Sequence, residues 1–173
     1  IVGSQRVWEA AERAGVRRFL FVSTDDVYRP SRAPHSEDDA TEPFNCYGVS
    51  KLTSEKALAI QSRNGGPQLI IGRMFNVYGP GETNPHILPE ILRQIRSGVR
   101  TIELGNLWPV RDYIYVNDAA EALIRLMDTA SPPAVVNVGT GGGWTVEQLV
   151  ALLAEAIGIP IKAVSAPERC RPA

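Results

Sequence analysis

Two apolar runs separated by a helical segment constrain the fold of this chain more than any other feature. The runs are Phe19–Ser23 (FLFVS) and Gln68–Phe75 (QLIIGRMF). An uninterrupted apolar run predicts a strand that is covered on both faces, as in a parallel sheet. Between the runs, Cys46–Ser62 has the apolar spacing of a helix. Strand, loop, helix and strand together predict a βαβ unit with a right-handed crossover.

The same alternation continues along the rest of the chain. A helical pattern at the start ends near Gly15, and further helices are predicted at Ile87–Ser97, Asn117–Asp128 and Thr145–Ile157. Short strands are predicted at Thr101–Leu104, Tyr113–Val116 and Val135–Val138. In Gly139–Gly143, the spacing is not that of a dinucleotide-binding loop, and Thr145 with Gln148 forms a capping-box pattern after it. Alternating strands and helices predict an α/β fold.

Composition excludes several classes of function. The chain has 173 residues and a formal net charge of −1, so nothing in it suggests a nucleic-acid partner. Its apolar runs are far shorter than the roughly 20 residues of a membrane span, which predicts no membrane insertion. Cys46 and Cys170 are too few for a disulfide framework, and His35 and His86 have no neighbours at metal-ligand spacing. We therefore expect a cytoplasmic protein without a metal.

Chemistry-bearing residues follow both predicted strands and begin the helix between them. In an open α/β sheet, ligands bind beyond the carboxyl ends of the strands, so these segments should converge there. The spacing Tyr47-x-x-x-Lys51 places both side chains on one helical face. An ammonium group and a positively charged nicotinamide ring would both favour the phenolate of Tyr47, and Thr24 could hold a substrate hydroxyl. The alternative is an ordinary surface Tyr–Lys pair.

Four segments in order along the chain resemble the landmarks of one family, the extended short-chain dehydrogenase/reductases. They are Gly15–Tyr28 (GVRRFLFVSTDDVY), Tyr47–Lys51 (YGVSK), Arg73–Pro80 (RMFNVYGP) and Arg111–Asp118 (RDYIYVND). The family includes NAD-dependent epimerases and 4,6-dehydratases that act on nucleotide-linked sugars. The resemblance implies the C-terminal half of a Rossmann-like, doubly wound parallel sheet, together with part of a small α/β substrate-binding lobe.

The resemblance also implies roles for individual residues. Tyr47 would be the catalytic acid/base, Lys51 would bind the nicotinamide ribose, and Thr24 would orient the sugar hydroxyl. The cofactor would be NAD, with NADP as the alternative. The residues implied to line its site are Ser23, Tyr47, Lys51, Phe75 and Val77.

Two residues would contact the diphosphate of a nucleotide-linked sugar. Asn76 is implied as one contact, and Arg111 suits the other because a guanidinium can pair with two phosphate oxygens. The alternative for Arg111 is a salt bridge with Asp112. Trp108 would either wall the nucleotide pocket or belong to the core.

The pair Asp25–Asp26 bears on which reaction is catalysed. In 4,6-dehydratases of the family, the corresponding threonine is followed by Asp-Glu, and these residues expel the C6 hydroxyl and take the C5 proton. Two carboxylates in this chain therefore favour a dehydratase, with both residues catalytic, although Asp26 is one methylene shorter than glutamate. The alternative is that both residues only shape the loop.

The implied organisation places residues 1–80 in the Rossmann-like catalytic domain and residues 81–173 mainly in the substrate lobe, with 112–130 returning to the catalytic domain. The glycine-rich loop with which family members bind cofactor phosphates is not in this sequence. We therefore expect the chain to be a fragment of a longer enzyme, and a homodimer by analogy. The alternatives to a dehydratase are a nucleotide-sugar 4-epimerase, a 4-ketoreductase, and a non-catalytic sugar-nucleotide-binding remnant without cofactor.

Overall fold

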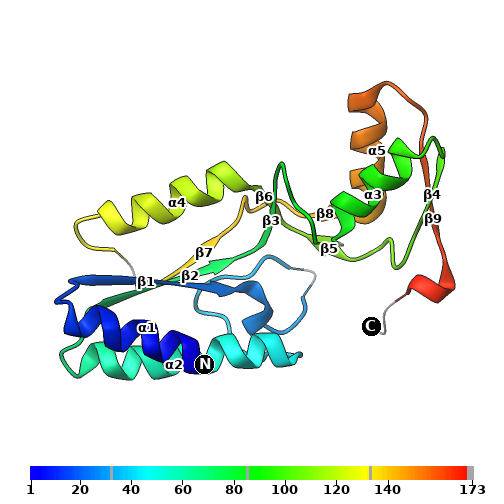
Figure 1. Ribbon diagram of the computed structural model, residues 1–173. Coiled ribbons are helices and arrows are strands. Elements are labelled where there is room, and N and C mark those ends of the chain that lie inside the picture. Colours follow the sequence, from blue (N-terminus) through cyan, green and yellow to red (C-terminus); the bar gives the residue numbers. More distant parts are fainter. Residues whose placement is uncertain (32, 85, 133, 171–173) are drawn as a thin grey trace. The chain divides into compact units, whose positions relative to one another are not determined.

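Three parallel strands, β1 (Arg18–Thr24), β2 (Gln68–Met74) and β7 (Val135–Val138), form the main sheet in the order β1-β2-β7 of the computed structural model (Figure 1). The structure describes residues 1–31, 33–84, 86–132 and 134–170. The described residues divide into two units. The first contains residues 1–77 and 114–140, and the second contains residues 78–113 and 141–173. The predicted α/β fold is confirmed.

Helices cover both faces of the main sheet. Helices α1 (Val2–Arg13) and α2 (Cys46–Arg63) lie side by side on one face, and α4 (Val116–Asp128) lies on the other (Figure 1). The face toward α1 and α2 is packed by a cluster around the fully buried Trp8 and Leu58. The cluster toward α4 contains Ile114, Ala119 and Val138. Burial of these apolar side chains is the main force that holds the layers together.

The second unit has its own core. It contains α3 (Ile87–Arg96), α5 (Val146–Ile157), the parallel pair β4 (Thr101–Leu104) with β9 (Lys162–Ser165), and the turn η2 (Pro167–Arg169). Strands β5 (Val110–Arg111) and β8 (Trp144–Thr145) pair antiparallel. Its buried apolar side chains come from α3, β4 and α5, and they are Ile91, Ile102, Leu104, Val146 and Val150. The predicted capping box of Thr145 and Gln148 is present at the start of α5.

Three features differ from the sequence-based expectations. Strands β5, β8 and β9 were not predicted, and neither was β3 (Asn76–Tyr78). Runs of two to four residues give only a weak periodic signal, which was sufficient for Thr101–Leu104 and Val135–Val138 but not for these four. The first strand is not covered along both faces, because Val22 is 41% exposed. The chain returns to the first unit within β6 (Tyr113–Tyr115), and the returning segment continues to Thr140. It continues that far because β7 pairs with β2. Among the described residues, no helix is long and apolar enough to cross a membrane.

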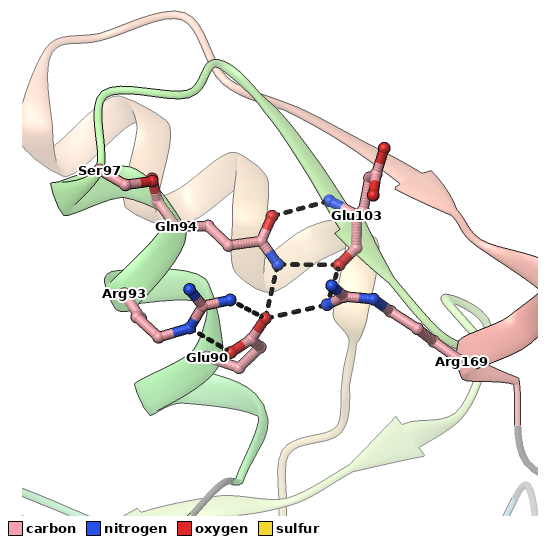
Figure 2. A network of polar contacts seen from close by, with 6 residues as sticks. All are labelled: Glu90, Arg93, Gln94, Ser97, Glu103 and Arg169. Carbon is pink, nitrogen blue, oxygen red and sulfur yellow. Dashed lines mark hydrogen bonds and ion pairs between the residues drawn. The ribbon is translucent and has the colours of Figure 1, made fainter.

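A polar network fastens the end of the second unit to α3 (Figure 2). The Glu90 carboxylate accepts hydrogen bonds from Arg93 of α3 at 2.8 Å and from Arg169 of η2 at 2.9 Å. The side-chain nitrogen of Gln94 donates to Glu90 and, at 2.8 Å, to the backbone oxygen of Glu103. Its side-chain oxygen accepts from the backbone N–H of Glu103 at 2.9 Å. The hydrogen bond from Arg93, opposed by partial burial and reinforced by Gln94 and Arg169, lowers the pKa of Glu90 from 4.5 to about 2. The carboxylate form therefore stabilises the folded unit.

We expect the stabilising contribution of Glu90 to vanish in acid. Because its folded pKa is about 2 and its unfolded value is 4.5, the contribution is complete above about pH 4.5 and is lost as pH falls toward 2. Urea unfolding of the wild type and of Glu90→Gln between pH 2 and 7 measures this directly. The difference in free energy of unfolding should be largest near neutral pH and should shrink steadily below pH 4.5. A difference that stays constant over this range would show that the charge of Glu90 contributes nothing.

Candidate active site

The carboxyl end of β1 carries Thr24, whose hydroxyl organises the turn that follows. Thr24 is the N-cap of η1 (Asp25–Val27), and its Oγ1 accepts a hydrogen bond from the backbone N–H of Asp26 at 3.2 Å. The same hydroxyl donates to Oδ1 of Asp25 at 3.2 Å. Capping of this kind satisfies an N–H group that the short helix leaves unpaired. The turn therefore holds both predicted carboxylates beside the hydroxyl.

Tyr47 and Lys51 lie one turn apart at the start of α2, as the spacing predicted. The Lys51 Nζ atom is 5.8 Å from the centre of the Tyr47 ring and donates a hydrogen bond to the backbone oxygen of Val22 at 2.8 Å. That bond ties α2 to β1 next to Thr24. Tyr47 is 54% exposed, so its phenol is accessible to a ligand.

The surroundings of Tyr47 favour its protonated form. Partial burial raises the pKa of the phenol, and the negative charges of Asp26 and Asp25 raise it further, whereas a hydrogen bond with Thr24 lowers it. The net direction is upward from the ordinary tyrosine pKa of 10.0. At neutral pH the side chain is therefore a proton donor, and it needs a nearby positive charge before it can act as a base.

Asn45 and Gly48 join the carboxylate turn to the beginning of α2. The Asn45 side chain caps α2 by accepting from the N–H of Gly48 at 2.7 Å, and its amide nitrogen donates to Oδ2 of Asp26 at 3.1 Å. Gly48 packs so closely that an added Cβ would lie 2.2 Å from the backbone oxygen of Asp26. These two contacts set the separation between Asp26 and the adjacent Tyr47.

Replacing Gly48 by alanine is expected to destabilise the protein by about 1–3 kcal/mol, because the new methyl overlaps a backbone atom that cannot rotate away. Gly3 in α1 provides the matched control, since nothing lies within 4 Å of a Cβ added there. Gly3→Ala should leave stability unchanged or raise it by up to about 1 kcal/mol, as alanine favours helices. Urea denaturation of both variants checks this. Equal effects of the two substitutions would contradict the close packing of Gly48 on the turn.

The residues implied for the nicotinamide side of the site also lie in the first unit. Ser23 is 2% exposed, and its hydroxyl has no hydrogen-bond partner among the described residues. Phe75 donates its N–H to the backbone oxygen of Val138 at 3.1 Å, and Val77 packs against the apolar cluster beside α4. A buried hydroxyl without a described partner, one residue after the Val22 carbonyl that accepts from Lys51, is a donor that fits a nicotinamide ribose.

The predicted diphosphate contacts are divided between the units. Asn76 begins β3 in the first unit, whereas Arg111 ends β5 in the second. Arg111 is exposed and donates to the backbone oxygen of Val110 at 3.2 Å, while Asp112 accepts from the N–H of Gly141 at 2.8 Å. Trp108 is 60% exposed, so the alternative that places it in the core is wrong for this structure.

Four residues of the site region had no assigned role in the sequence-based prediction. Asn45 could have been found, because an asparagine directly before a predicted helix is a common N-cap. The other three form a buried polar group, Tyr28, Glu55 and Arg73. Only the position of Glu55, four residues after Lys51, hinted that it shares a helical face with the predicted site.

Comparison with known proteins identifies the family of this chain. Residues 1–139 match the model of the NAD dependent epimerase/dehydratase family. A UDP-glucose 4-epimerase of Corynebacterium glutamicum is 33% identical over 98% of this chain and 56% of its own length. A dTDP-glucose 4,6-dehydratase of Streptomyces griseus is 29% identical over 90% of this chain and 48% of its own length. The chain thus spans about half the length of the curated relatives that it matches.

A solved structure supports the same assignment. MoeE5, in complex with UDP-glucuronic acid and NAD, superposes with a TM-score of 0.82 at 33% identity, and the match covers 98% of this chain and 57% of MoeE5. The fold of this chain is therefore a known one. The chain belongs to the NAD dependent epimerase/dehydratase family.

Proposed function

We propose that this chain supplies the proton-transfer residues of an enzyme that transiently oxidises C4 of a nucleotide-linked sugar with a bound nicotinamide cofactor. The observation that carries the proposal is the convergence of Thr24, Tyr47 and Lys51, with Lys51 Nζ held 5.8 Å from the Tyr47 ring. Such a group can move a proton to and from a sugar hydroxyl. UDP-glucuronic acid and NAD bound to MoeE5 support this class of substrate and cofactor.

Each residue would have a distinct task. Thr24 would orient the C4 hydroxyl, Tyr47 would take up and return its proton, and Lys51 with Ser23 would hold the nicotinamide ribose. The cofactor, when bound, supplies a positively charged ring that accepts and returns the hydrogen at C4. That charge opposes the negative charges of Asp25 and Asp26, so it would lower the pKa of the phenol from its raised value. Of the two residues proposed to contact the diphosphate, Asn76 belongs to the first unit and Arg111 to the second.

The position of the two carboxylates supports dehydration as the second step. Asp25 accepts from the Thr24 hydroxyl at 3.2 Å, and both carboxylates act electrostatically on Tyr47. A 4-keto intermediate makes the C5 proton acidic, so one of the two carboxyl groups would take that proton while the other gives a proton to the C6 hydroxyl, which leaves as water. A 4-epimerase or a 4-ketoreductase would need neither carboxylate for proton removal at C5. The relatives include a UDP-glucose 4-epimerase and a dTDP-glucose 4,6-dehydratase, which are consistent with either outcome.

Incubating the complete protein with UDP-glucose and dTDP-glucose in D2O distinguishes these reactions. Dehydration should give a 4-keto-6-deoxy sugar with deuterium at C5, whereas epimerisation gives a C4 epimer without deuterium. A reductase would consume reduced cofactor in net amounts when given a 4-ketosugar. If calorimetry shows that the protein binds a nucleotide sugar but no product or isotope exchange appears with NAD or NADP, it is a non-catalytic binding protein and the proposal fails.

We also propose that the protein is a homodimer formed through α1 and α2. Both helices expose large apolar side chains, among them Val2 at 72%, Val7 at 60%, Val49 at 50% and Ile60 at 57%. Large exposed apolar side chains on two neighbouring helices are typical of an interface. A single mass near that of one chain in light scattering would overturn this.

Cys46 and Cys170 are free cysteines on the surface, which supports a reducing compartment such as the cytoplasm.

A further inference from the structure

The sheet face toward α1 and α2 changes abruptly from apolar to polar near the carboxyl ends of the strands. Neighbouring residues of the three strands form two rows across the sheet, an apolar row and, two residues further along each strand, a polar row. The apolar row is Phe21, Ile71 and Val135, and the polar row is Ser23, Arg73 and Asn137. The apolar row packs in the core beneath α1 and α2. The polar row begins with Ser23, which precedes Thr24 of the candidate active site.

Arg73 is the centre of the polar row. Its guanidinium binds Glu55 through two hydrogen bonds, of 3.2 Å from Nε and 2.8 Å from Nη2, with side chains only 7% and 4% exposed. The third nitrogen, Nη1, donates to the Tyr28 hydroxyl at 2.8 Å. That hydroxyl in turn donates to Oδ1 of Asn137 at 2.8 Å. A continuous chain of hydrogen bonds therefore joins α2, β2, the segment after η1 and β7.

The same network reaches the long loop before α2. Asn137 donates from its side chain to the backbone oxygen of His35 at 3.1 Å and from its backbone to Glu37 at 2.8 Å. The ring of His35 stacks on Tyr28, with centres 4.6 Å apart and an angle of 10° between the rings. Tyr28 is 1% exposed beneath this loop. It is therefore held from both sides.

Both ends of the network adjoin residues of the proposed catalytic group. Glu55 follows Lys51 by one helical turn on α2. The backbone N–H of Tyr28 donates to the carbonyl of Asp25 at 2.9 Å and so closes the turn that carries Asp25 and Asp26. A buried ion pair is often no more stabilising than apolar side chains of the same volume, so stability alone does not account for this arrangement. The arrangement is accounted for if it fixes the orientation of the turn relative to α2.

We propose, on the basis of the function proposed above, that Tyr28 is a positioning residue whose hydroxyl fixes the turn Asp25–Val27 relative to Tyr47. It acts through the two strands that it bridges, β2 by way of Arg73 and β7 by way of Asn137. Without this hydroxyl the turn keeps its contacts with Asn45 and Gly48 but loses its links to β2 and β7. The carboxylates and Thr24 then sample positions that do not suit proton transfer, while the residues that bind the nucleotide are untouched. Turnover therefore suffers more than binding.

The test compares two substitutions on the same sheet face in the complete enzyme. Tyr28→Phe removes only the bridging hydroxyl, and Ile71→Val removes one methyl group from the apolar row as the control. We expect Tyr28→Phe to lower kcat at least tenfold, with KM for the nucleotide sugar within twofold of wild type. Ile71→Val should keep kcat within twofold. If Tyr28→Phe keeps wild-type kcat while its Tm falls, the network is only structural and the proposal is wrong.

Two further measurements keep the outcome decisive. Asn137→Ala breaks the network at its other end, so it should reproduce the loss of kcat if Tyr28→Phe does not fold, and wild-type kcat in this variant would overturn the proposal. The backbone amide NMR signals of Asp25 and Asp26 should shift in Tyr28→Phe and not in Ile71→Val. These signals can be recorded without turnover. If the wild type proves inactive, the proposed function is refuted, and the NMR signals still test whether Tyr28 positions the turn.

Discussion

The substitution Tyr47→Phe is expected to reduce kcat of the complete enzyme by about 10²–10⁴-fold, which is the usual contribution of a positioned general acid or base. This change removes only the phenolic hydroxyl, which hydrogen-bonds with Thr24, and keeps the ring, whose centre lies 5.8 Å from Nζ of Lys51. Because Tyr47 is 54% exposed, the fold does not depend on its hydroxyl. The free energy of unfolding should therefore stay within about 0.5 kcal/mol of wild type.

Tyr115→Phe is the matched control for this experiment. It makes the same chemical change in the same unit, in β6, which is a different element from the turn Asp25–Val27 and from α2. Its kcat should stay within threefold of wild type. Steady-state kinetics with saturating cofactor and nucleotide sugar measure both variants. Retained turnover in Tyr47→Phe would mean that another group moves the proton, and the catalytic assignment of Tyr47 would have to be abandoned.

The substitution Glu55→Leu is expected to lower the free energy of unfolding by about 3–5 kcal/mol, because it leaves the buried guanidinium of Arg73 without its counterion. Although burial lowers the pKa of Arg73, its hydrogen bonds to Glu55 and Tyr28 raise it overall, so the group stays charged. Urea denaturation at neutral pH provides the measurement. The double variant Glu55→Leu/Arg73→Met should recover most of the loss, since it replaces both charges by apolar side chains of similar size.

An exposed ion pair in the same unit serves as the control. Glu121 binds Arg125 at 2.5 Å on α4, with side chains 60% and 76% exposed. Glu121→Leu should change stability by no more than about 1 kcal/mol, because solvent screens exposed pairs. Similar losses for Glu55→Leu and Glu121→Leu would show that burial of the Glu55–Arg73 pair is energetically unimportant.

The sequence by itself was sufficient for the elements whose patterns are local. The strand Phe19–Ser23 is observed as Arg18–Thr24, and the helix predicted from Cys46 begins at that residue. The spacing of Tyr47 and Lys51 places them on one turn, since a helix has a fixed period. The family resemblance, based on motifs in a fixed order, is confirmed by the family model over residues 1–139. The roles of the individual site residues remain predictions.

The sequence alone determined the α/β fold and the identity of the candidate catalytic group, because apolar periodicity and motif spacing are properties of neighbouring residues. Only the tertiary structure decided how that group is supported. The bonds of Arg73 to Glu55 and Tyr28, and of Tyr28 to Asn137, join residues 18, 45 and 109 positions apart. Short strands such as β9 likewise exist only through pairing with a distant partner. Such contacts form between residues that are distant in the sequence, so no local sequence pattern predicts them.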